Sequence, residues 1–441
     1  MSRAKAKIDA KQGSSMGELK RRLFFVLFAI LVYRLGSYIP VPGIDPARLA
    51  DMFHSHQSGL LGMFNMFSGG ALRRMTIFAL GVMPYISASI IVQLFTPMTP
   101  SLKSLQKEGE QGRRKLNQYT RYLTGALALL QSLGVAKWLM ASKAVYITGP
   151  MFYFVAAVTL VTGTMFLMWL GEQMTERGIG NGISLLIFAS IASRLPSAVS
   201  DLFMQVQQGQ MQVITLLVLV AFILCVIGVI VFMESAQRRI PIQYPQSQAA
   251  KGGRPQSHLP LKINMAGVIP VIFAQSILLF PSFLASTFSK FHGLSWLNGV
   301  ALQLSQGHLV YNIVFIIAIF FFCFFYSSLQ FNPKETAERL KKQGAIIDRT
   351  RPGLQTAKYI EKIMDRLIVV GAIYLTLVAL LPQILMALWH VPFYFGGTSL
   401  LIVVVVMMDF VSQVQTHVMS RYYKSWNSSK GGSRGGGGFV R

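Results

Sequence analysis

The feature that most constrains this chain is a series of apolar stretches, each about 20 residues long, the length a helix needs to cross roughly 30 Å of hydrocarbon. Of its 441 residues, 53% are hydrophobic and only 13% are charged, which excludes an ordinary soluble protein of this length. The sequence therefore predicts an all-α membrane protein with ten transmembrane spans. The expected spans are 23–42, 76–96, 119–138, 152–171, 183–203, 213–233, 263–287, 309–331, 367–388 and 396–416.

The lysines and arginines lie mainly on one side of this topology. The two tails and the connections on their side carry 33 of the 41, whereas the opposite connections carry six. Cytoplasmic loops of membrane proteins are enriched in Lys and Arg. The amino-terminal tail, 1–22, and the glycine-rich carboxyl-terminal tail, 417–441, are therefore both expected in the cytoplasm.

Two of the expected cytoplasmic loops, 234–262 and 332–366, are longer than orientation requires. The net charge of +25 is concentrated on this side, and attraction to anionic lipid explains part of it. Both loops could also dock a polyanionic partner, either ribosomal RNA or an acidic protein surface. Neither interleaves aromatic and basic residues as a surface for single-stranded nucleic acid does, and composition leaves the choice of partner open.

The sequence offers little that could support catalysis. It contains no G-x-x-x-x-G-K-[ST] loop, no H-E-x-x-H and no G-x-S-x-G. Cys225 and Cys323 lie in apolar runs and indicate neither a disulfide framework nor a zinc site. Glu172 and Glu234 are expected at water-accessible ends of spans. Asp409 is expected deeper, but one acid makes a poor proton relay, so a structural role is favoured for it. We therefore expect no enzyme, no cofactor and no metal.

One apolar segment is too short to be a span. "GLLGMFNMFSGG" at 59–70 ends on two glycines and precedes the span at 76–96. Broken helices occur in secondary transporters, which bind small solutes near the bilayer midplane. A transporter of a small solute is therefore an alternative, although the residues expected near the midplane are mostly apolar.

Two aliphatic pairs are spaced to share a helix face. Val82 and Ile86 are four residues apart, as are Ile187 and Ile191. At 1.5 Å per residue the first pair is expected roughly 9–15 Å from the outer end of its helix, and Ile191 about 12 Å from the inner end of its own. The two pairs could meet at one depth, or each could face lipid or a neighbouring helix.

Seven motifs occur in a fixed order between residues 39 and 404, and the resemblance that they carry extends from about Glu18 to about Gln415. They are "IPVPGID" (39–45), "FNMFSGGAL" (64–72), "LGVMPYISASIIVQL" (80–94), "LGEQMTERGIGNGISL" (170–185), "HLPLKINMAGVIP" (258–270), "RPGLQTAKYI" (351–360) and "VPFYFGGTSLLIVV" (391–404). In these motifs the chain resembles the bacterial SecY family, whose members are the central subunits of the protein-conducting Sec channel. The final "GGSRGGGGFVR" lies outside the resemblance.

The resemblance implies two five-helix halves, related by inverted pseudo-symmetry, that close around an hourglass pore. The halves would be 23–203 and 213–416, hinged at the connection between them. A ring of aliphatic side chains would form the waist of the pore. Its members would be Val82, Ile86, Ile187, Ile191, Ile272 and Ile402. Val82 stands where the family usually carries Ile, which implies a marginally looser seal.

The segment at 60–74 is implied to be a plug that packs under this ring on the outer side. It combines soft apolar side chains with a hinge of small residues. Its residues are Met63, Phe64, Asn65, Met66, Phe67, Ser68, Gly69 and Gly70.

The second and seventh spans are implied to form a lateral gate, through which a signal sequence leaves into lipid. Its residues would be Ser87, Gln93, Gln275 and Phe280. Interhelical amide hydrogen bonds, worth about 0.6 kcal/mol each, would hold this gate shut and still let a hydrophobic segment open it.

The resemblance also implies partners and a location. Arg351 in "TRPG" and Arg238 and Arg239 in "AQRRI" would contact the SecA motor or the ribosome. SecE and SecG would be companion subunits, SecDF and YidC further partners, and an unfolded preprotein with a signal sequence the substrate. The implied location is the bacterial cytoplasmic (inner) membrane, where the chain would also contact lipid.

Overall fold

The computed structural model divides the chain into two compact units, one of Met1–Arg194 with Val406–Arg441 and the other of Leu195–Val405. The structure describes residues 2–45, 48–49, 68–142, 144–146, 149–209, 212–243, 257–288, 299, 303, 308–347, 350–389 and 397–431. The first boundary lies inside the expected fifth span, whereas the resemblance implied a hinge at the 203–213 connection. It coincides with two turn residues, Ser193 and Arg194, that interrupt this span.

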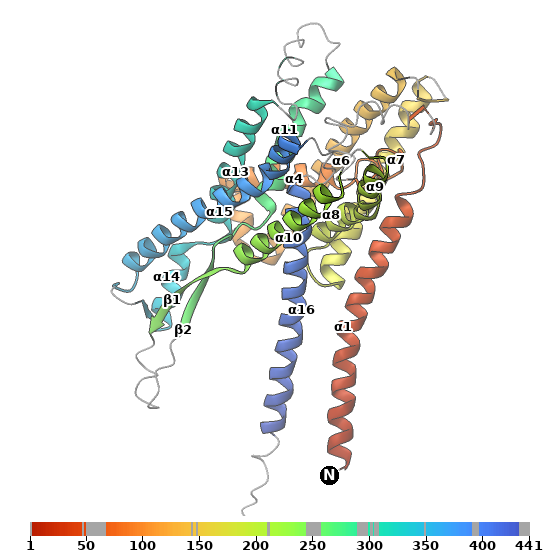
Figure 1. Ribbon diagram of the computed structural model, residues 1–441. Helices are drawn as coiled ribbons and strands as arrows, with labels where there is room; N and C mark the ends of the chain where they lie inside the picture. The colour runs from red at the N-terminus through yellow and green to blue at the C-terminus, as the bar shows by residue number, and fades with distance from the viewer. Residues whose placement is uncertain are drawn as a thin grey trace, which may run out of the picture. The chain divides into compact units, whose positions relative to one another are not determined.

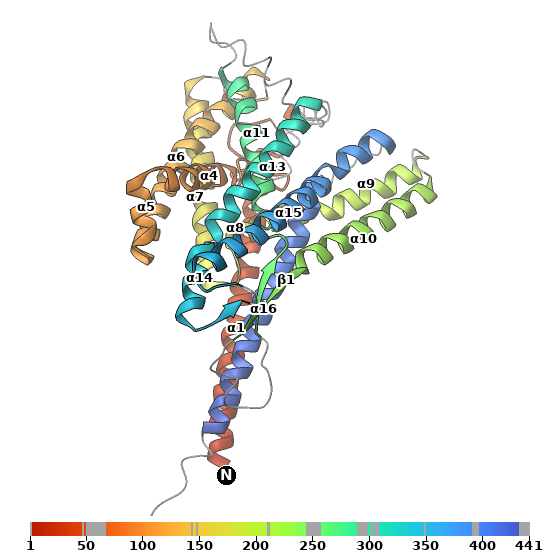
Figure 2. The same ribbon diagram turned by 90° about the vertical axis from the view of Figure 1, so that its left-hand side faces the viewer.

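The first unit holds the amino-terminal helices. Its elements are α1 (Ser2–Gly36), α4 (Met83–Met98), α5 (Pro100–Lys107), α6 (Glu110–Ala141), α7 (Pro150–Arg177), α8 (Gly182–Ala192) and the part of α16 (Gly397–Gly431) that follows Val405. α7 packs against α6, α1 and α8 (Figure 1). The amino end of α1 and the carboxyl end of α16 point the same way in both views (Figures 1 and 2), which agrees with an even number of crossings.

Residues 68–82, which precede α4, form a series of turns. The span expected at 76–96 therefore begins later, at Met83. Gly81 has a φ of +58°, outside the helical range, so the helix cannot extend back through it. Backbone hydrogen bonds instead tie this segment to the residues after α1, from the Val41 amide to the Met75 carbonyl (2.9 Å) and from the Ile77 amide to the Ile39 carbonyl (3.0 Å).

The second unit holds the remaining membrane helices and a small sheet. Its helices are α9 (Leu195–Gln207), α10 (Val213–Ser235), α11 (Ile269–Phe288), α13 (Leu309–Gln330), α14 (Pro333–Lys342), α15 (Leu354–Trp389) and the start of α16. α9 and α10 lie side by side (Figure 2), and α13 packs between α11 and α15.

Helix occupies all or most of each of the ten expected spans. Among the described residues, seven helical segments are long and apolar enough to cross a membrane, and two shorter apolar ones lie at Met83–Met98 and Ile269–Leu278. Each expected membrane crossing is therefore mainly helical. The fifth span is interrupted, because α8 ends at Ala192 and α9 begins at Leu195.

The two long loops expected at 234–262 and 332–366 are not simple connectors. They contribute β1 (Gln237–Gln243), β2 (Ser257–Lys262) and β3 (Ile346–Ile347), an antiparallel sheet of order β2-β1-β3 that the sequence reasoning missed. Together with α14 and the start of α15 these strands form what we call the sheet module (Figure 1). Its own apolar core consists of Ile240, Ile242, Leu261, Leu340, Ala345, Ile347, Ile360 and Met364.

Candidate functional site

The first aliphatic pair lies at the very start of α4. Val82 is the N-cap residue, and its carbonyl accepts a hydrogen bond from the Ile86 amide at 3.0 Å. The expectation that both residues lie roughly 9–15 Å into a helix is therefore wrong, because it counted the turns before Met83 as helix. The two side chains are nevertheless buried, with exposures of 3% and 4%.

The second pair is carried by α8. The Asn181 side chain caps this helix by accepting hydrogen bonds from the amides of Ile183 (3.0 Å) and Ser184 (3.3 Å). A side chain at Gly182 would collide with the Gly171 carbonyl on α7, so α8 can lie against α7 only because glycine is present there. Ile187 and Ile191 are both buried on this closely packed helix.

The remaining two members of the expected ring belong to the second unit. Ile272 lies on α11 and Ile402 on α16, and both are buried. Four of the six residues thus lie in one unit and two in the other, and none of the six has the exposed side chain that lipid contact would require. Their meeting at a single constriction stays a prediction.

The expected plug falls largely outside the described residues, which include only Ser68, Gly69 and Gly70 of its members. Ser68 is buried: its carbonyl accepts a hydrogen bond from the Tyr33 hydroxyl at 3.3 Å, and its own hydroxyl accepts one from the Leu72 amide at 3.1 Å. Gly69 and Gly70 have φ values of +64° and +84°, which favour glycine. This part of the segment is a turn.

Of the expected gate residues, the two glutamines make defined hydrogen bonds. The Gln275 amide donates to the Thr398 hydroxyl at 2.8 Å and so joins α11 to α16 within the second unit. The Gln93 amide donates to Ser89, one turn back on its own helix, at 2.9 Å. Each of these bonds uses one of the two protons of its NH₂ group, and a bond between the second and seventh spans stays a prediction. Ser87 is half-buried, and the Phe280 side chain lies outside the described residues.

The three arginines expected to contact a motor or ribosome all lie in the sheet module. Arg238 and Arg239 are exposed on β1, in register with Leu261 and Pro260 of β2. Arg351 is exposed in the turn before α15, where its carbonyl accepts a hydrogen bond from the Thr356 hydroxyl at 2.9 Å. A folded module thus presents these charges, and the sequence signal that could have revealed it is the alternation of Ile240 and Ile242 with polar or imino residues.

The three carboxylates at or within the expected spans lie in different surroundings. Glu234 is 7% exposed rather than open to water, and it accepts a hydrogen bond from the Asn264 amide at 2.7 Å. Glu172 forms a bidentate ion pair with Arg121 of α6, at 2.9 and 2.7 Å. The Asp409 side chain is exposed on α16. Within the described part of the chain, no three His, Cys, Asp or Glu side chains gather as a metal site would require.

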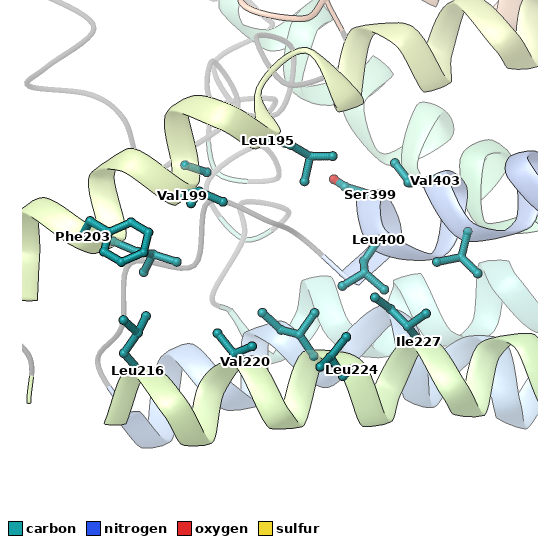
Figure 3. A pocket seen from close by; sticks show the side chains of 14 residues that line it. Leu195, Val199, Phe203, Leu216, Val220, Leu224, Ile227, Ser399, Leu400 and Val403 are labelled. Atoms are coloured by element: carbon teal, nitrogen blue, oxygen red, sulfur yellow. The ribbon is translucent and has the colours of Figure 1, made fainter. Parts of the chain in front are cut away.

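The second unit also contains an apolar cavity of about 420 Å³ between α9, α10 and the start of α16 (Figure 3). Its lining is almost entirely aliphatic, with Phe203 at one side and the Ser399 hydroxyl as the one side-chain oxygen drawn. A solute site in a transporter needs polar groups that fix the orientation of the solute. This cavity does not provide them, so it lends no support to the transporter alternative.

The arrangement of helices defines a class of membrane protein. A solved protein-conducting channel has the same fold, with a TM-score of 0.68 at 18% identity over 91% of this chain and 93% of that one. Sec61 in the canine ribosome-channel complex matches with a TM-score of 0.65 at 18% identity, over 91% and 93% of the two chains. The chain therefore has the all-α membrane fold of these solved channels.

The sequence comparison is more specific. A model of the SecY family matches residues 76–411. The protein translocase subunit SecY of Vibrio cholerae is 56% identical over 420 residues, which cover 93% of this chain and 94% of that protein. The chain belongs to the SecY family.

Proposed function

We propose that the chain conducts unfolded polypeptides through an aliphatic ring and that the segment at 60–74 blocks this ring at rest. The proposed ring consists of Val82, Ile86, Ile187, Ile191, Ile272 and Ile402. The observation that carries the proposal is that all six side chains are buried although they come from four separate segments. Residues that served only to meet lipid would be exposed in this chain.

The general function rests on family membership. The chain is a protein-conducting channel subunit of a translocase, and it is not itself an enzyme. Relatives that are more than half identical over nearly their whole length carry the name protein translocase subunit SecY. Energy for transport therefore comes from outside the chain, from a partner motor or from the proton-motive force.

An aliphatic constriction suits this task for a physical reason. A narrow apolar waist disfavours a continuous column of water, so an empty pore blocks ions by dewetting. Branched aliphatic side chains can also change rotamer and close around a passing chain of any sequence. A rigid polar filter would bind some sequences and reject others.

We also propose the orientation and the partners. Both termini face the cytoplasm of a bacterium, as the distribution of 33 against six basic residues favours, and the membrane is the inner membrane. The sheet module then lies on the cytoplasmic side and offers Arg238, Arg239 and Arg351 to the SecA motor or to the ribosome. A solved relative occurs in a ribosome-channel complex, which supports the second partner. SecE and SecG complete the proposed complex, and SecDF and YidC join it at times.

The lateral gate is proposed between α4 and α11, with Ser87, Gln93, Gln275 and Phe280 on its two sides. Cysteines at positions 87 and 280 give a direct test, because a crosslink should hold the gate closed and abolish export. Export that continues at the wild-type rate with the crosslink formed would refute the gate assignment.

Reconstitution tests the function as a whole. The purified complex in lipid vesicles should carry a preprotein into a protease-protected compartment only when SecA and ATP are added. Saturable binding of a small solute by the complex, without any preprotein transport, would overturn the proposal in favour of a transporter.

A further inference from the structure

We propose that Tyr33, Ser68 and Ser190 form a polar latch. It holds 68–70, which we call the plug base, against α8, the helix that carries the proposed ring residues Ile187 and Ile191. The inference rests on the proposed roles of segment 60–74 and of Ile187 and Ile191. It assigns Tyr33 as a positioning residue that keeps the plug in its resting place. All three members of the latch lie in the first unit, and each is only 2% exposed.

The geometry places one phenol hydroxyl between two partners. The Tyr33 hydroxyl on α1 lies 2.6 Å from the Ser190 hydroxyl on α8 and 3.3 Å from the Ser68 carbonyl at the plug base. Ser190 directly precedes Ile191 in the sequence and follows Ile187 by less than one helical turn. A single side chain thus connects the plug base to the helix of the ring.

The protons of the two hydroxyl groups can be arranged in two ways, and only the first supplies a proton to the Ser68 carbonyl. Ser190 donates to Tyr33, and Tyr33 donates to the Ser68 carbonyl, so each hydroxyl proton is used once. In the other arrangement Ser190 donates to the Leu186 carbonyl at 2.8 Å, and Tyr33 donates to Ser190. The Ser68 carbonyl then no longer accepts a hydrogen bond from Tyr33, while the shorter bond between the two hydroxyls persists. The latch can therefore release the plug base without leaving either hydroxyl unpaired.

Aromatic packing keeps the phenol in position. The Tyr33 ring stacks on Phe78 at a centroid distance of 6.0 Å, and Phe78 stacks on Phe166 of α7 at 5.9 Å. A side chain at Gly36 would collide with the Phe78 ring, so the glycine lets this stack lie directly against α1. The anchor of the latch is therefore rigid, and the plug base is the part that can leave.

The two glycines after Ser68 differ in a way that supports this division. A Cβ atom at Gly69 would come within 3.0 Å of the Ser190 backbone and 3.2 Å of the Tyr33 hydroxyl. A Cβ atom at Gly70 would meet nothing within 4 Å. Both positions have positive φ, so an alanine is strained at either one, but only at Gly69 does it also push into the latch. Gly69 therefore lets the plug base lie directly against Ser190, whereas the free space at Gly70 allows a hinge there.

Tyr33→Phe is the direct test, because it keeps the stacked ring and removes only the hydroxyl. The loss of one ordinary hydrogen bond should raise the population of displaced plugs roughly two- to tenfold. The readouts are the resting ion conductance in planar bilayers and the export of a preprotein with a weakened signal sequence, and both should rise by that factor. A purely structural tyrosine would lower the yield of the complex and leave both readouts unchanged, which would overturn the latch.

The glycine pair supplies a matched control. Gly69→Ala should increase resting conductance more than Gly70→Ala, since the backbone strain is shared and only the first substitution disturbs Ser190. Equal conductances for the two variants would also overturn the latch. A further variant distinguishes failure of the latch from failure of the ring. It replaces Ile86, Ile187 and Ile402 together with Ser. If that variant leaks and Tyr33→Phe does not, the latch is wrong and the ring stands; if neither leaks, the proposed function of the ring fails.

Discussion

The surroundings of the plug base and the sheet module differ in how tightly they pack and in where their polar and charged groups lie. Around the plug base, side chains and glycines pack so closely that an added methyl group at Gly36, Gly69 or Gly163 would meet a neighbour. Two of its buried hydroxyl groups, those of Tyr33 and Ser190, are paired at 2.6 Å. In the sheet module, a small apolar core supports a surface of exposed charges.

Because of this difference, the two regions should respond to different changes. A buried, neutral region changes state when packing or hydrogen bonds change, and added salt has little effect on it. An exposed basic surface responds to the charge of a partner and to ionic strength. Mutations in the first region should therefore change the resting seal, and mutations in the second should change the coupling to a partner.

The largest effect is expected at the ring itself. Replacing Ile86, Ile187 and Ile402 together with Ser should raise the resting ion conductance roughly tenfold or more, because hydroxyl groups let water fill the constriction. Planar-bilayer recordings of the purified complex measure this directly. The triple Val variant at the same positions is the control, since it keeps the residues aliphatic and should leak far less. If resting conductance stays at the wild-type level with all three Ser substitutions, these residues do not form the ring.

A charge reversal in the sheet module should separate partner coupling from sealing. Arg351→Glu should lower motor-dependent preprotein transport about tenfold, because an acid would then face the partner surface that we propose Arg351 contacts. Resting conductance should stay at the wild-type level. Lys341→Glu, which changes the same amount of charge at an exposed position of α14, is the control.

Two outcomes would argue against this assignment. Equal losses for Arg351→Glu and Lys341→Glu would indicate a diffuse electrostatic effect rather than a specific contact. A wild-type transport rate that does not fall between about 50 and about 200 mM salt would show that charge does not govern coupling at all.

The sequence predicted the membrane helices well and the irregular parts poorly. A span is recognised by its length and apolar composition, and both are local properties. The start of α4 was missed because "TIFALGV" at 76–82 is as apolar as a helix, while the positive φ of Gly81 leaves no trace in hydropathy. The sheet was missed because its strands are short, and β3 has only two residues.

Candidate site residues could be named from the sequence only where a motif carries them. The family resemblance supplied Ile272 and Ile402, where spacing alone offered only two pairs. All six proposed ring residues are buried, and their meeting at one constriction stays a prediction. The contact between Tyr33 and Ser190 joins residues 157 positions apart in the chain. Such a hydroxyl pair depends on how α1 and α8 pack, which no local pattern reveals.

A core substitution in the sheet module should have a smaller, more local effect. Leu261 is 2% exposed, so Leu261→Ala should destabilise the module by about 2–4 kcal/mol through the cavity it leaves. Limited proteolysis of the complex in membranes should then cleave the 234–262 region faster. Leu259→Ala, on the same strand but only half-buried, should have a weaker effect. If Leu261→Ala raised the resting conductance, the sheet module and the seal would not be functionally separate.

The smallest effect is expected at the hydrogen bond between Gln275 and Thr398. Interhelical side-chain bonds in membrane proteins contribute about 0.6 kcal/mol on average, since the unfolded state in the membrane also finds partners. A double-mutant cycle with Gln275→Leu and Thr398→Val, followed by denaturant unfolding in detergent, should give a coupling energy of that size. Export of a normal preprotein should change less than about twofold, which corresponds to well under 1 kcal/mol. Because the Gln275 carbonyl oxygen has no hydrogen-bond partner, Gln275→Leu alone should cost less than Thr398→Val, which leaves a buried amide unpaired. A coupling energy above about 2 kcal/mol would mean that this bond, and not packing alone, fixes α11 to α16.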